Sequence, residues 1–161
     1  MRILGIDPGT GITGWGIIEK QETQLLANKI KVIAYGVIRT SAGLDMPIRL
    51  KDLYDELSDL IEKFSPTEVA IEDLFFFKNQ KTVIKVGQAR GVAIIAAVNK
   101  DLPVFDYTPL QVKQAVTSYG RASKSQIQKM VKVILNLQEI PKPDDAADAL
   151  AVAICHLNAR M

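Results

Sequence analysis

The sequence predicts an α/β fold in which helices flank a mixed five-stranded sheet. Three β-rich runs come first with no helix between them, which predicts an antiparallel meander. Two further β-rich runs are separated by helical periodicity, which predicts parallel strands joined by helices. With 161 residues, 48% of them hydrophobic and 24% charged, residues 1–161 are expected to form a single domain.

The predicted meander occupies the first quarter of the chain. Residues 2–6 are an apolar run that ends at Asp7, and Gly9, Gly11 and Gly14 then mark a turn. Residues 15–19 and 30–39 are the second and third strand candidates. A strand that ends in an acid therefore opens the predicted fold.

Helical periodicity begins after the meander. Apolar residues recur at steps of three and four over residues 47–64, which predicts an amphipathic helix, and residues 68–72 then predict a buried strand ending in Glu72. The remaining elements are a strand at 103–106 and helices at 80–100, 109–117, 123–137 with Ser123 as N-cap, and 144–158.

The predicted helix 80–100 is rich in small residues, which permit the close approach of another element. We expect it to form the contact between two copies of the chain, with small residues between the backbones and apolar residues beside them. The alternative is that the helix packs on its own sheet. The residues concerned are Gly87, Ala89, Gly91, Ala93 and Ala97, together with Val86, Ile94 and Val98.

Charge is distributed unevenly along the chain. Residues 1–77 carry 8 basic and 12 acidic residues, whereas residues 78–161 carry 12 basic and 6 acidic residues. Residues 78–132 contain ten basic residues against Asp101 and Asp106 only. This asymmetry favours a polyanionic partner, and solvated helix faces are the alternative.

Cysteine content and hydropathy indicate the compartment. Cys155 is the only cysteine, so neither a disulfide framework nor a cysteine zinc site is expected, and a buried apolar role is favoured for it. The longest apolar stretch, at residues 91–98, is far shorter than the ~20 residues of a membrane span. These features predict a cytoplasmic protein with no membrane partner.

Four acids form the candidate site. Asp7 and Glu72 each end an apolar strand, and the i,i+3 spacing of Asp145 and Asp148 places both on one helix face. Acids brought together in this way favour hard divalent ions such as Mg²⁺ or Mn²⁺, and two ions ~3.5–4 Å apart promote phosphodiester hydrolysis. A turn-forming role for Asp7 and a helix-dipole role for Asp145 and Asp148 are the alternatives.

Six motifs along the chain closely resemble those of RuvC Holliday junction resolvases in order and spacing. The resemblance covers nearly the whole chain. The motifs are Ile3-Leu-Gly-Ile-Asp-Pro-Gly-Thr10, Gly14-Trp-Gly16, Ala70-Ile-Glu72, Lys85-Val-Gly-Gln-Ala-Arg-Gly-Val92, Gln111-Val-Lys-Gln114 and Asp145-Ala-Ala-Asp-Ala-Leu-Ala151.

The resemblance implies an RNase H-like fold and a metal-dependent endonuclease. Such an enzyme cuts two opposed strands of four-way DNA junctions by phosphodiester hydrolysis, in recombination and DNA repair. It also implies that Asp7, Glu72, Asp145 and Asp148 are the catalytic metal ligands for two Mg²⁺ ions per site, with Mn²⁺ able to substitute. A homodimer and branch-migration partners of the RuvA/RuvB type are further implications.

The resemblance assigns DNA-binding roles as well. Phe75 matches a position associated with the bases at the junction core, and Lys113 and Lys124 match basic positions near the scissile backbone. Lys81 and Lys85 are less specific candidates, for which a solvated surface role is the alternative. The sequence leaves open whether Phe76 or Phe77 contacts bases, and whether Asp144 takes part in the metal site.

Three other functions are compatible with parts of the sequence. The segment 7–14 also resembles the phosphate loop of actin-like ATPases, but those proteins need a second related domain. A junction-binding protein without activity and a nuclease for other branched nucleic acids are the other two. For His156, the only histidine, we expect a structural or solvent-facing role.

Overall fold

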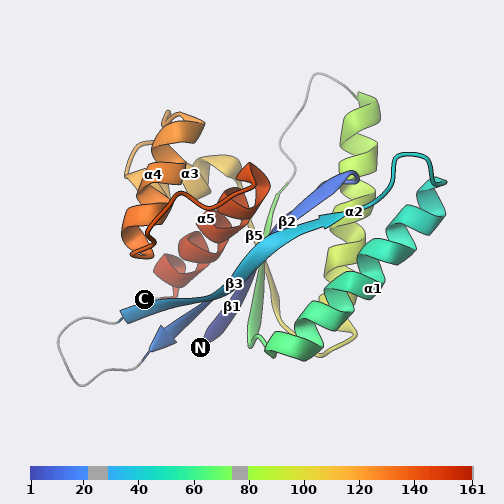
Figure 1. Cartoon of the computed structure of the whole chain (residues 1–161), viewed down its shortest axis with the longest axis horizontal. Helices are drawn as coiled ribbons and strands as arrows, with labels where there is room; N and C mark the ends of the chain where they lie inside the picture. Colours follow the sequence, from blue (N-terminus) through green and yellow to red (C-terminus); the bar gives the residue numbers. More distant parts are fainter. Residues whose placement is uncertain (22–28, 74–79, 161) are drawn as a thin grey trace.

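A computed structural model describes residues 1–21, 29–73 and 80–160, which form three layers with a sheet in the middle (Figure 1). The sheet has the strand order β3-β2-β1-β4-β5. β1, β2 and β3 pair antiparallel, whereas β4 pairs parallel with β1 and β5 parallel with β4. The meander and the parallel strands predicted from the sequence are therefore confirmed. The strands are β1 (Arg2–Asp7), β2 (Ile12–Gln21), β3 (Lys29–Arg39), β4 (Glu68–Glu72) and β5 (Val104–Tyr107).

Helices cover both faces of the sheet (Figure 1). α1 (Met46–Phe64) and α2 (Gln80–Val98) lie on one face, and α3 (Pro109–Thr117), α4 (Lys124–Ile134) and α5 (Asp144–Ala159) lie on the other. Each face has its own core, because side chains alternate along a strand. Thus Ile3 packs in the core beneath α5, and Leu4 packs in the core beneath α1.

Two elements differ from the sequence prediction by three residues or more. The helix expected over 123–137 ends at Ile134, because Asn136 adopts a positive φ of 49° that a helix does not continue through. The second strand is ten residues long, twice the expected length. The predicted N-cap Ser123 is confirmed, since its side chain accepts a hydrogen bond from the backbone N–H of Gln126 in a capping box.

α5 lies directly against the backbone of β1 and β2. A Cβ atom at Gly5 would collide with the carbonyl oxygen of Ala149 and would lie 2.8 Å from the backbone nitrogen of Ala153. A Cβ atom at Gly14 would collide with the carbonyl oxygen of Asp145. Glycine at both positions lets the first turns of α5 reach the sheet without an intervening side chain.

The small residues of α2 face the chain's own sheet. Ala89, Ala93 and Ala97 are at most 1% exposed and belong to the core shared with α1 and the strands. The expectation that these alanines separate two copies of the chain is therefore wrong. The outer face of α2 presents Ile84, Ile95 and Val98 instead, each more than half exposed.

Candidate active site

Asp7 and Glu72 meet at the same edge of the sheet. β1 and β4 run parallel with Ile6 opposite Ile71, so the next residue of each strand is one of these two acids. Neighbouring strands lie ~4.8 Å apart, and residues at one level of a parallel pair point to the same side. A side-chain hydrogen bond joins the two carboxyl groups.

The first turns of α5 add two further acids to this edge. Gly14 pairs with Asp7 across the β1–β2 ladder, and the backbone of Asp145 rests against Gly14. Asp148 follows one helical turn later and lines the same cavity as Glu72. All four sequence-predicted acids therefore converge.

The electrostatics of the cluster show strong mutual repulsion. Burial and the nearby charges of Glu72, Asp148 and Asp145 raise the pKa of Asp7 to about 8. Burial also raises the pKa of Glu72, although a hydrogen bond from Asp7 opposes the shift, and raises the pKa of Asp148 against the attraction of Lys124. Positive charge brought into the cluster would therefore favour the ionised carboxylates.

Two lysines supply part of that charge. Lys124 Nζ lies 2.8 Å from Asp148 Oδ2, and the positive charge of Lys113 opposes the rise in the pKa of Glu72. Both lysines line a cavity of about 250 Å³, which is large enough for several water molecules or ions. Its lining comprises Glu72, Pro109, Val112, Lys113, Lys124, Ile127, Asp148 and Ala151.

The acids provide oxygen ligands of the kind that Mg²⁺ and Mn²⁺ prefer. As the side chains stand, no three histidine, cysteine or acidic residues among those described surround one point closely enough to hold an ion. Asp7 instead shares a hydrogen bond with Glu72, and Asp148 pairs with Lys124. The donor set fits a hard divalent cation once these two contacts open.

The other predicted residues lie outside this cluster or outside the described residues. Phe75 falls in residues 74–79, which the structure does not describe, and Lys81 is in α2 but its side chain is not described. Lys85 is exposed on α2, in the helix layer across the sheet from α3, α4 and α5 (Figure 1). Asp144 has 62% of its side chain exposed and lies 3.7 Å from Lys124 Nζ.

The structure adds a set of ion pairs that the sequence did not predict. Asp73, which follows Glu72, forms an ion pair with Arg90 at 3.6 Å, and Arg90 also pairs with Asp106 at 2.6 Å. These contacts tie the end of β4 to α2 and β5. The position of Arg90 beside a strand-end acid could not be read from sequence spacing, because the pair spans three elements.

Comparison with known proteins gives concordant results. The family model described as "Crossover junction endodeoxyribonuclease RuvC" matches residues 3–156. The RuvC of Caldanaerobacter subterraneus subsp. tengcongensis is 58% identical over 156 residues, which are 97% of this chain and 92% of that protein. The RuvC of Desulforamulus reducens is 57% identical over 156 residues, which are 97% of this chain and 93% of that protein.

Solved structures show the same likeness. Thermus thermophilus RuvC superposes with a TM-score of 0.90 at 36% identity, covering 100% of this chain and 96% of that one. T. thermophilus RuvC in complex with Holliday junction substrate superposes with a TM-score of 0.88 at 34% identity and the same coverage. A yeast mitochondrial Holliday junction resolvase, with a TM-score of 0.66 and 17% identity, shares the fold alone. The RNase H-like fold expected from the sequence is confirmed.

Proposed function

The chain belongs to the RuvC family of crossover junction endodeoxyribonucleases, and from this premise we propose how its residues perform the reaction. It is an endonuclease that resolves Holliday junctions in DNA recombination and repair. We propose that Asp7, Glu72, Asp145 and Asp148 hold two Mg²⁺ ions, with Mn²⁺ as a substitute. The convergence of these four acids with two lysines carries the proposal.

The chain's own residues have distinct parts in the proposed reaction. When bound, Mg²⁺ would supply an activated water and would stabilise the leaving oxygen of the phosphodiester. Asp7 would release its shared proton to solvent water, so that it and Glu72 present carboxylate oxygens. Lys124 leaves Asp148 and, with Lys113, faces the scissile phosphate from the α3 and α4 side of the cavity.

Cleavage of labelled substrates tests the proposal. Four-way, three-way and linear DNA are compared with Mg²⁺, and binding is measured with Ca²⁺ in its place. We expect paired cuts in opposed strands of the four-way junction only. Binding without cuts would support a junction-binding protein without activity, and equal cutting of three-way DNA would support a broader nuclease for branched substrates.

Phe75, Lys81 and Lys85 are proposed DNA contacts on the strength of the family resemblance. Aromatic stacking on an unpaired base contributes ~1–3 kcal/mol, so a phenylalanine at this position would hold open the junction core. Phe75→Ala should therefore slow cleavage far more than it weakens binding. Equal losses in both measurements would contradict this role.

We propose a two-fold homodimer, because two opposed cuts need two active sites and the four acids form one cluster per chain. The outer face of α2 is the proposed contact, since its exposed Ile84, Ile95 and Val98 have no covering element among the described residues. Branch-migration proteins of the RuvA/RuvB type are the proposed partners. None of the described helices is long and apolar enough to cross a membrane. A cytoplasmic location is proposed from the free thiol of Cys155.

A further inference from the structure

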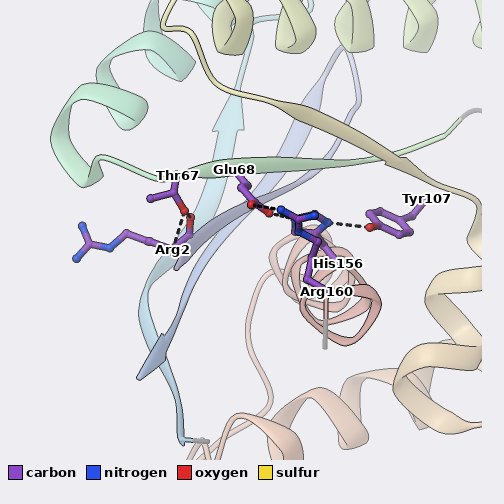
Figure 2. A network of polar contacts seen from close by, with 6 residues as sticks. All are labelled: Arg2, Thr67, Glu68, Tyr107, His156 and Arg160. Atoms are coloured by element: carbon purple, nitrogen blue, oxygen red, sulfur yellow. Dashed lines mark hydrogen bonds and ion pairs between the residues drawn. The ribbon is translucent and has the colours of Figure 1, made fainter. Parts of the chain in front are cut away.

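His156 is fully buried at the end of α5 and bonds to two other elements at once (Figure 2). Its Nε2 lies 2.5 Å from Glu68 Oε2, at the start of β4. Its Nδ1 lies 2.7 Å from the hydroxyl of Tyr107, at the end of β5. Of the two roles expected for His156, the structural one is confirmed and the solvent-facing one is wrong.

Both ring nitrogens of His156 have a hydrogen-bond partner. A carboxylate only accepts hydrogen bonds, so Nε2–H donates to Glu68, and in a neutral ring Nδ1 then accepts from the Tyr107 hydroxyl. Arg160 donates to the other oxygen of Glu68 at 2.9 Å, and the ring of Phe105 lies 4.5 Å from the imidazole centroid. The polar chain is therefore closed, with the negative charge of Glu68 balanced by Arg160.

Two of the three elements joined by these hydrogen bonds carry acids of the site. α5 bears Asp148 eight residues before His156, a rise of ~12 Å along the helix. β4 bears Glu72 four residues after Glu68, a rise of ~13 Å along the strand. The two elements run in opposite directions, so a fixed contact at Glu68 and His156 sets the axial position of Asp148 relative to Glu72.

Tyr107 extends the same connection to the third side of the site. Its carbonyl oxygen accepts a 2.8 Å hydrogen bond from the backbone N–H of Asp73, the residue after Glu72. Thr108, the next residue of the chain, caps α3, which carries Lys113 into the cavity. The hydrogen bond of the Tyr107 hydroxyl to His156 therefore fixes the distance from α5 to both the start of α3 and the end of β4.

α5 packs on the sheet through apolar side chains such as Leu150 and through its backbone at Gly5. Apolar packing is non-directional, whereas the hydrogen bonds of His156 have fixed partners and directions and so define the axial position of the helix more sharply. We propose that Glu68, His156 and Tyr107 are positioning residues that lock α5 to β4 and β5 and so fix the spacing of the four acids. This inference rests on the proposed metal-binding function of those acids.

Single-atom variants test the inference. Tyr107→Phe removes one hydroxyl from the network, and Tyr54→Phe is the matched control, because its hydroxyl accepts from Asn99 on the α1–α2 side, where no element carries an acid of the site. Mn²⁺ binding to the folded, DNA-free protein is measured by electron paramagnetic resonance. Junction affinity in Ca²⁺ and single-turnover cleavage in Mn²⁺ are measured on the same samples.

We expect Tyr107→Phe to lower Mn²⁺ affinity about tenfold and to slow cleavage at low Mn²⁺, with junction affinity unchanged. Tyr54→Phe should match the wild type in all three measurements. His156→Gln, which keeps one donor and one acceptor, should fall between the wild type and His156→Ala. All samples are compared at a temperature where circular dichroism shows them folded, so lost stability alone does not change Mn²⁺ affinity.

Two results have distinct meanings. If the wild type neither binds Mn²⁺ nor cuts junctions, the proposed function of the acids fails. If the wild type does both and Tyr107→Phe binds Mn²⁺ as tightly as Tyr54→Phe does, the acids stand and the positioning role is overturned.

Discussion

Asp7 is a carboxylic acid whose pKa is raised by burial and by three other acids. Asp7→Asn keeps the shape of the side chain and removes a charge that the cluster repels. We expect cleavage to fall more than ~100-fold while junction binding is retained, since the side chain is a proposed ligand and not a DNA contact. The melting temperature without metal should stay the same or rise. A variant that still cuts in Mg²⁺ would exclude Asp7 as a ligand.

Asp144 and Asp145 form a natural comparison for the same assay. Asp144 is exposed, and its carboxylate lies 3.7 Å from Lys124 Nζ. Asp145 is half-buried, and its backbone lies against Gly14. Asp145→Asn should abolish cleavage and Asp144→Asn should have a mild effect. The reverse result would mean that the wrong pair of acids on α5 has been assigned.

Glu68 makes the stability of the protein depend on pH. Burial raises the pKa of Glu68, but the hydrogen bonds from His156 and Arg160 outweigh burial, so the pKa is lowered from 4.5. The folded state therefore binds this proton less readily than the unfolded state. The stabilisation is present above pH 4.5 and is lost as the pH falls through the lowered pKa.

Thermal unfolding of wild type and Glu68→Gln checks this dependence. The wild type should melt at the higher temperature at neutral pH, and the gap should narrow below pH 4.5. A gap that stays constant down to pH 3 would show that the Glu68 charge does not contribute.

The positions of single residues could be predicted where they follow from chain position alone. Asp7 and Glu72 were found because each ends an apolar strand, and Asp145 and Asp148 because of their helical spacing. The partners of His156 could not be predicted in this way. Glu68 and Tyr107 lie 88 and 49 residues from it in the chain, and only the packing of α5 across β4 and β5 brings them together.

At the scale of the element, α2 presents two faces with opposite roles. Ile95 is 52% exposed on its outer face, and Ala93 is 1% exposed against the sheet. Ile95→Glu should give a folded monomer by light scattering, one that nicks a single strand at most. Ala93→Glu should instead destabilise the fold by more than about 3 kcal/mol, because it buries an unpaired charge.

Ile48→Glu on α1 is the control for this prediction, because Ile48 is 47% exposed on another helix. It should leave the oligomeric state unchanged. A dimer that survives Ile95→Glu would place the contact elsewhere, and a monomeric wild type would refute the dimer.

The existence and order of the elements were predictable, whereas the side of α2 that lies against the sheet was not. Small residues occur on both sides of this helix, with Ala89 and Ala93 on one side and Gly91 on the other. Periodicity is weak in such a sequence, so it does not identify the buried side. The buried side of α2 is decided by its packing on the sheet, which requires small side chains such as alanine at the contact.

At the scale of the whole molecule, the basic second half of the chain predicts salt-dependent binding. Each phosphate contact contributes about 0.9 to the negative slope of log affinity against log salt. Lys113→Gln should reduce the magnitude of that slope by about 1. Lys51→Gln should not change it, because Lys51 is an exposed partner of Asp55 on α1, across the sheet from the cavity. Binding that is independent of salt would contradict phosphate contacts.

Backbone contact between α5 and the sheet has a consequence for mutational tolerance. At Gly5 and Gly14 the helix touches main-chain atoms, so the distance between the α5 backbone and the sheet at these points does not depend on a side-chain rotamer. The two cores should then accept many volume-conserving substitutions with little loss of activity. In a library selected for junction resolution, positions 5 and 14 should admit glycine alone, whereas Ile3 and Ile18 should vary among aliphatic residues. The distance between α5 and the sheet would thus be set at two residues that have no side chain.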